Sequence, residues 1–153
     1  MKLPASLLAR QTPAVRAMLT KAQNRGVLVT TDVTRDGDVL VIVLRGMKMP
    51  SLANMGPGPQ IRAKAAQSAV LRPLLAGLAR PPLPWDVEIV RIAPKLLDAA
   101  TNCDASAKRI VDDLAKFAGV DDATDEIVRY TVRQEHGQTC VRIRIGPRID
   151  RST

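Results

Sequence analysis

Eight of the fifteen carboxylate side chains of this 153-residue chain lie in one stretch, between Asp98 and Glu126. The chain as a whole is basic, with a formal net charge of +8. Because Lys and Arg neutralise DNA phosphates and release counterions, this charge favours a polyanionic partner. Carboxylates gathered within a basic chain are typical of a metal-dependent nuclease, in which hard cations take oxygen ligands beside phosphate-binding side chains. One polar helix and two acidic turns would give the same composition.

Other kinds of catalytic or metal-binding motif are missing from the sequence. It contains no Walker loop, no G-x-G-x-x-G, no H-E-x-x-H and no G-x-S-x-G. The single histidine, His136, is expected to be a solvated residue in a turn. Cys103 and Cys140 lack the C-x-x-C spacing of a zinc knuckle or redox pair and are expected to be thiols. Only three aromatic residues are present, which argues against a single-strand binder that stacks bases on aromatic rings.

Before the acidic stretch, the sequence alternates between helical and strand-like patterns. A helix is expected near residues 13–25, followed by two strands near 27–34 and 38–45 that an Asp-Gly pair joins as a hairpin. A loop rich in Pro and Gly leads to a basic helix over residues 60–79, which Pro73 kinks or breaks.

The next strand is expected over residues 85–93, with Asp86, Glu88 and Arg91 as its outward charges. A helix over residues 103–118 then places its apolar side chains on one face, and Gly119 ends it. The opposite face carries Asp104, Lys108, Asp112 and Lys116 at intervals of four residues.

Two last strands, near residues 127–134 and 139–145, are expected to form a second hairpin. These patterns predict an α+β fold: a single domain with a mixed or antiparallel sheet and two or three helices. No apolar run approaches the roughly 20 residues that span a bilayer, so a soluble, cytoplasmic protein without membrane association is expected.

Six short segments occur in an order found in a known family. They are Pro50-Ser51-Leu52-Ala53-Asn54, Ile61-Arg62-Ala63-Lys64, Arg91-Ile92-Ala93-Pro94, Asp98 with Asn102, Lys108 with Asp112, and Gly119-Val120-Asp121-Asp122. In this order they resemble the phage-borne branch of the RusA-type Holliday junction resolvases. The resemblance covers roughly residues 38–145. It therefore implies a RusA-like nuclease-fold domain over 38–153, preceded by an N-terminal helix and strand extension over 1–37.

The resemblance implies a magnesium-dependent endonuclease, with manganese as the alternative metal, that cuts four-way DNA junctions in recombination and repair. Such a hydrolase would act as a homodimer, since a junction has two symmetric scissile strands. By position, the implied catalytic residues are Asp98, Lys108 and Asp122, and the implied metal ligands are Asp98, Asp121 and Asp122. Asp104 is a further expected metal ligand, which would take over the role of an aspartate that the family has and this chain lacks. Predicted contacts to the DNA backbone are Arg62, Lys64, Arg72, Lys108, Arg129, Arg133, Arg142 and Arg144.

The sequence also departs from the family, which leaves alternatives open. Ala99, Ala100 and Thr101 stand where the family has further aspartates. A catalytically inactive, RusA-like DNA-binding or structural protein is therefore the second hypothesis. A protein-binding module, whose affinity for DNA would depend little on salt, is the third.

Each acidic residue also has a local structural interpretation. Thr101 could cap a helix with Asp104 in the first turn, where a carboxylate is favoured. Lys108 could pair with Asp104 or with Asp112 along an exposed helix face. Asp121 and Asp122 could simply form a turn.

Overall fold

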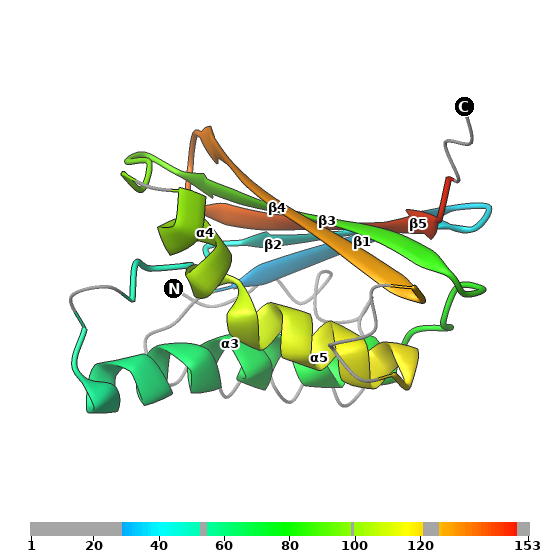
Figure 1. Cartoon of the computed structure of the whole chain (residues 1–153), viewed down its shortest axis with the longest axis horizontal. Helices are drawn as coiled ribbons and strands as arrows, with labels where there is room; N and C mark the ends of the chain where they lie inside the picture. Colours follow the sequence, from blue (N-terminus) through cyan, green and yellow to red (C-terminus); the bar gives the residue numbers. More distant parts are fainter. Residues whose placement is uncertain (1–28, 53–54, 99, 121–125, 150–153) are drawn as a thin grey trace.

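In the computed structural model, which describes residues 29–52, 55–98, 100–120 and 126–149, a five-stranded sheet carries its helices on one face (Figure 1). The elements are β1 (Thr30–Asp36), β2 (Val39–Arg45), α3 (Pro57–Ala76), β3 (Trp85–Ala93), α4 (Ala100–Ser106), α5 (Lys108–Ala118), β4 (Val128–His136) and β5 (Cys140–Pro147). The strand order is β1-β2-β5-β3-β4, antiparallel throughout except that β3 and β4 run parallel. The predicted α+β fold with a mixed sheet is therefore confirmed.

The first hairpin forms where the sequence predicts it. β1 pairs with β2 from Thr30 opposite Arg45 to Asp36 opposite Val39. Gly37 takes a φ of 59°, a conformation that side chains with a Cβ rarely adopt. The hairpin crosses the predicted boundary at residue 37, so the described part of the predicted extension is an edge strand of the main sheet.

The expected second hairpin is wrong, because β4 and β5 do not pair. β5 lies between β2 and β3, while β4 adds to the outer edge of β3. The connection between them crosses the end of β3, where the Gly137 amide donates to the Ala93 carbonyl at 3.0 Å. β3 has no exposed residue and is buried at most of its positions, which suits a strand that lies between two neighbours.

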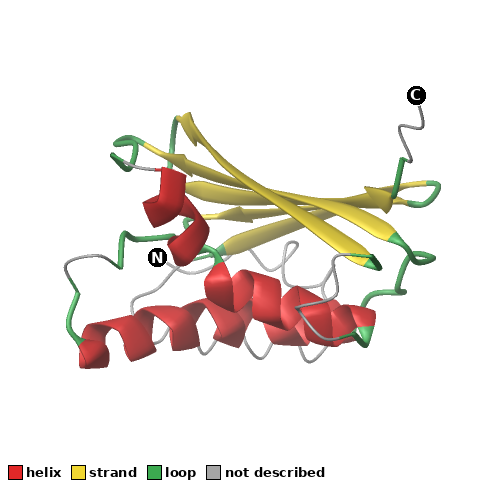
Figure 2. Ribbon diagram, in the orientation of Figure 1, coloured by secondary structure: helices red, strands yellow, loops and turns green. Residues whose placement is uncertain are grey.

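The core lies between the sheet and the helices (Figure 2). Alternate residues of each strand point into it, as the two-residue period of a strand requires. The fully buried members include Leu40, Ile42, Leu44, Leu71, Trp85, Ile89, Ile110, Leu114, Ile143 and Ile145. Each such side chain contributes about 1.5–3 kcal/mol on burial. Trp85 also donates its indole N–H to the Pro81 carbonyl at 3.0 Å and lies 5.6 Å from the Phe117 ring.

The helices differ from expectation at three points. α3 continues through Pro73 to Ala76 instead of breaking there. The helix predicted over 103–118 is two helices, since the chain turns at Ala107 between α4 and α5. Thr101 does not precede a helix as its cap, because α4 already begins at Ala100. The predicted end at Gly119 is confirmed by its left-handed φ of 76°. Within the described ranges, no helix is both long and apolar enough to cross a bilayer.

A buried carboxylate joins α3 to α5. Asp113 is 2% exposed and accepts hydrogen bonds from the Ser68 hydroxyl at 2.7 Å and from Arg72 Nε at 2.8 Å. It lies three residues after Ile110 and one before Leu114, on the side of α5 that faces the core. This cluster fixes how the two helices pack.

Candidate functional site

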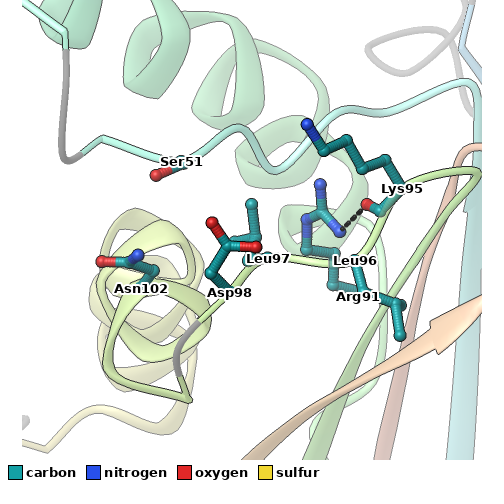
Figure 3. A pocket seen from close by; sticks show the side chains of 7 residues that line it. All are labelled: Ser51, Arg91, Lys95, Leu96, Leu97, Asp98 and Asn102. Carbon is teal, nitrogen blue, oxygen red and sulfur yellow. Dashed lines mark hydrogen bonds between the residues drawn. The ribbon is translucent and has the colours of Figure 1, made fainter.

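A pocket of about 290 Å³ lies where the loop after β3 leads into α4 (Figure 3). Three segments that are distant in sequence meet there: the loop after β2, the end of β3 with its following loop, and α4. The lining residues are Ser51, Arg91, Lys95, Leu96, Leu97, Asp98 and Asn102. The pocket thus combines two cations, one carboxylate, one amide and one hydroxyl.

Arg91 is the most unusual side chain of this pocket, because it is only 9% exposed. Its Nε donates to the Met49 carbonyl at 2.7 Å and its Nη1 to the Lys95 carbonyl at 3.0 Å. No carboxylate of the described residues forms an ion pair with it. Buried charges in proteins are normally paired, so this guanidinium leaves a positive charge unbalanced beside the pocket.

The position of Arg91 corrects the sequence analysis, which placed it outward with Asp86 and Glu88. Residues of a strand alternate between its two faces, and Arg91 shares its parity with the buried Trp85 and Ile89. It therefore projects from β3 on the side that the helices cover.

Three further side chains of the pocket have unused hydrogen-bonding capacity. Lys95, Asp98 and Asn102 make no side-chain hydrogen bond or ion pair to any residue in the described ranges. Figure 3 shows the Asp98 carboxylate between Asn102 and Arg91, with Ser51 across from it on the loop after β2. The pocket can thus offer two positive charges and several polar groups to a ligand.

This combination of groups suits a phosphate group. A guanidinium matches phosphate oxygens with its fork of N–H donors, and Lys95 adds a second charge. The donors also fit a magnesium ion in part, since Asp98, Asn102 and Ser51 offer oxygen atoms. Magnesium is usually bound through one or two carboxylates together with substrate phosphates, so one carboxylate is compatible with it only when a phosphate is present.

The structure separates the other predicted metal ligands from this pocket. Asp98 lines it, whereas Asp104 is exposed on α4 and is not among its lining residues. Asp121 and Asp122 lie outside the described residues. Among the residues that are described, no three His, Cys, Asp or Glu side chains form a group that could hold a metal.

Lys108, predicted as the cation beside the scissile phosphate, does not line the pocket. It is the first residue of α5 and forms an ion pair with Asp112 at 3.0 Å, one of the two pairings considered from the sequence. Such an exposed pair at a spacing of four residues stabilises a helix by only about 0.2–0.5 kcal/mol.

The predicted basic strands do share one face of the sheet, but most of their arginines are ion-paired. Arg129 binds both Asp86 oxygens, at 2.9 and 3.0 Å. Arg133 contacts Glu88 at 3.2 Å and also Glu135, which accepts a further bond from Arg142. The hydrogen bond from Arg129 lowers the pKa of Asp86, and that from Arg133 lowers the pKa of Glu135.

These pairs make the centre of that face close to neutral. Arg144, which lies on the same side of β5 as Arg142, forms no ion pair with any described residue.

The three predicted DNA contacts on α3 fall into two groups. Arg62 is exposed and Lys64 partly buried, and neither forms an ion pair within the described part of the chain. Arg72 forms an ion pair with Asp113 and so takes part in the packing of α3 on α5. Arg62 and Lys64 are thus free to contact a polyanion, whereas Arg72 has a structural role.

Of the described residues that line the pocket, only Asp98 was predicted as a site residue, and both cations, Arg91 and Lys95, were missed. The sequence did contain a signal for Arg91, because it is a charged residue on the inward face of β3, where every other residue is apolar. Lys95 follows that strand in an irregular segment, where no periodicity indicates which way a side chain points.

Comparisons with known proteins do not assign the chain to a family. No family model matches it, and no curated protein matches it. The chain has a weak structural likeness to a solved structure described as a MotB-like protein from Desulfovibrio vulgaris. It is 17% identical and covers 94% of this chain and 98% of its own, with a TM-score of 0.38.

Proposed function

We propose that this protein acts on branched DNA as a magnesium-dependent endonuclease of the RusA type, with a backbone phosphate bound in the pocket beside Asp98. The observation that carries the proposal is the buried Arg91 charge, which has no described acidic partner and faces a pocket with an unpaired carboxylate. The resemblance of the acidic stretch to the resolvases supports the choice of DNA as the polyanion.

Each pocket residue has a role in this proposal. Arg91 and Lys95 bind the phosphate and stabilise the charge that develops on its oxygens during cleavage. Asp98, the Asn102 amide and the Ser51 hydroxyl would offer oxygen ligands to a magnesium ion bound together with the phosphate. A bound magnesium ion would polarise the phosphoryl oxygen and supply a hydroxide nucleophile at neutral pH.

A homodimer is part of the same proposal. A four-way junction carries two equivalent scissile strands, which a protein with two sites related by a twofold axis can engage together. Arg62 and Lys64 on α3, and Arg144 on β5, are proposed to contact backbone phosphates outside the pocket.

A second candidate is a protein that binds junctions without cutting them. The pocket has one carboxylate among the described residues, and Ala99 to Thr101 offer no further strong ligand. In that case the cations would still hold a phosphate, and magnesium would add nothing to the interaction.

The experiment compares a labelled four-way junction with a linear duplex, with and without magnesium. Paired nicks across the junction that require magnesium and disappear in Asp98→Asn and Asp122→Asn would support the endonuclease. Tight junction binding without nicks, in magnesium and manganese alike, would support the second candidate.

Arg91→Met and Lys95→Met test the phosphate contact in either case. Each should weaken junction binding and reduce the slope of log K against log salt by about 0.9, the value for one phosphate contact. Lys116→Met is the matched control, because Lys116 is an exposed lysine of α5 that does not line the pocket. Salt-independent binding of wild-type protein to every DNA would contradict both candidates.

A further inference from the structure

A second pocket adjoins the first and shares Arg91 and Lys95 with it. This pocket has a volume of about 320 Å³. Its lining residues are Lys48, Met49, Pro50, Arg91, Ile92, Ala93, Pro94, Lys95 and Thr139. We call it the base pocket, and the pocket that contains Asp98 the phosphate pocket.

The two pockets differ in chemistry. The phosphate pocket contains Asp98 and Asn102, whereas none of the described residues that line the base pocket has a carboxylate or amide side chain. Five of the nine residues that line the base pocket are Met, Ile, Ala or Pro. Its charged residues are cations, and Thr139 supplies a hydroxyl. A pocket of this size, mainly apolar with a few polar groups, is typical of a site for a small organic ligand or part of one.

A ligand that fills both pockets must therefore join an anionic group to an uncharged, largely apolar one. Arg91 and Lys95 lie at the boundary, where the anionic group would be shared. A nucleotide has this composition, because its phosphate is anionic and its base presents two apolar faces with polar edges.

We propose that the paired pockets hold one unstacked nucleotide of branched DNA, with its phosphate against Arg91 and Lys95 and its base in the base pocket. This inference rests on the proposed function and adds to it a means of recognising structure. A base must leave its stack to enter the pocket, which costs least where it is unpaired or mismatched. Apolar side chains such as Met, Ile and Pro commonly contact DNA at unstacked steps. The site would thus favour a branch point over a continuous duplex.

The first test changes the DNA and leaves the protein intact. Four-way junctions are prepared with one abasic nucleotide, placed in turn at each position around the branch point or, as the control, within a duplex arm. For wild-type protein we expect an abasic site at one branch position to weaken binding by about fivefold or more, which corresponds to the loss of about 1 kcal/mol of base contact. The same lesion within an arm should leave the affinity unchanged.

The second test fills the base pocket. Ala93 lines this pocket but not the phosphate pocket, so Ala93→Leu should block the base without removing a charge. Ala93→Leu should bind the intact junction more weakly and show no further loss on the abasic junction, whereas Ala93→Ser should behave as wild type. Circular dichroism and urea unfolding would check that both variants are folded.

The outcomes separate this inference from the proposed function. Tight, salt-dependent binding of the junction that is insensitive to every abasic position would overturn the base pocket and leave the proposed function standing. Failure of wild-type protein to bind any junction would overturn both. Equal sensitivity to abasic sites in Ala93→Leu and wild type would also contradict the inference, because the base would then be bound elsewhere.

Discussion

Replacing Asp113 tests whether α3 and α5 are joined by a buried ion pair or simply by apolar packing. Asp113→Ala removes the shared acceptor of the Ser68 hydroxyl and of Arg72 Nε. Ser68 is 8% exposed, so its hydroxyl loses its partner without gaining full access to water. An unsatisfied buried donor costs about 1–3 kcal/mol.

Loss of the Arg72 ion pair adds less to the destabilisation, because the Arg72 side chain is 47% exposed and water can solvate its charge once Asp113 is gone. An ion pair exposed to that degree contributes at most about 1 kcal/mol. The free energy of unfolding should therefore fall by about 2–4 kcal/mol in Asp113→Ala. At 2–4 °C per kcal/mol for a chain of this length, the midpoint of thermal unfolding should fall by about 4–16 °C.

Arg72→Ala should lower the free energy of unfolding by at least as much as Asp113→Ala. In Arg72→Ala the carboxylate, with no exposed side-chain surface, keeps only the Ser68 hydroxyl. An uncompensated buried charge of this kind typically costs about 3–5 kcal/mol. The double variant should then cost less than the sum of the two single changes, because removing both partners leaves no charge stranded.

Urea unfolding followed by fluorescence provides the measurement, since Trp85 is the single tryptophan and is fully buried in the core. Asp112→Ala is the matched control, because the neighbouring Asp112 is only in the i,i+4 pair with Lys108. The reasoning would be refuted if Arg72→Ala cost much less than Asp113→Ala, or if the two changes were simply additive.

Three further predictions concern single residues. The Arg129 hydrogen bond lowers the pKa of Asp86 below 3.8. The ionised Asp86 therefore stabilises the folded protein above pH 3.8, and this contribution is lost as the pH falls through the lowered pKa. The difference in unfolding free energy between wild type and Asp86→Asn should shrink accordingly between pH 6 and about pH 2. Gly119→Ala should cost about 1–2 kcal/mol in urea unfolding, because φ is 76° there and the new methyl would lie 3.0 Å from Arg80 Nη1. Burial raises the pKa of the Cys103 thiol, so iodoacetamide should modify it more slowly in the folded protein than in urea at pH 8, and equal rates would show that the thiol is accessible.

Local sequence signals predicted the elements well where a short-range rule decides the structure. The Asp36-Gly37 pair specified the first hairpin, and Gly119 specified the end of α5. The same rules could not decide the partners of β4 and β5. Two adjacent strands have the same alternating pattern whether they pair with each other or flank a third strand, and here the apolar β3 separates them.

In the candidate site, too, some residues could be predicted from local sequence patterns and others could not. Asp98 could be predicted from the acidic stretch, and the inward parity of Arg91 could have indicated that it is buried. That its charge has no acidic partner among the described residues depends on the tertiary structure, which local patterns do not predict. Asp113 could have been found, because it falls at a core-facing position between Ile110 and Leu114. The break at Ala107 has no clear signal in helix propensity, since alanine is the best helix former.

The order of the strands in the sheet has a consequence for how the protein is made. β5 is the last of the five strands to be synthesised, yet it lies in the middle of the sheet, between β2 and β3. Until β5 leaves the ribosome, no strand joins the β1–β2 hairpin to β3, and each of them exposes unpaired backbone N–H and C=O groups beside apolar side chains. The nascent chain should therefore depend on chaperones late in synthesis, and a chain truncated before residue 140 should aggregate instead of folding.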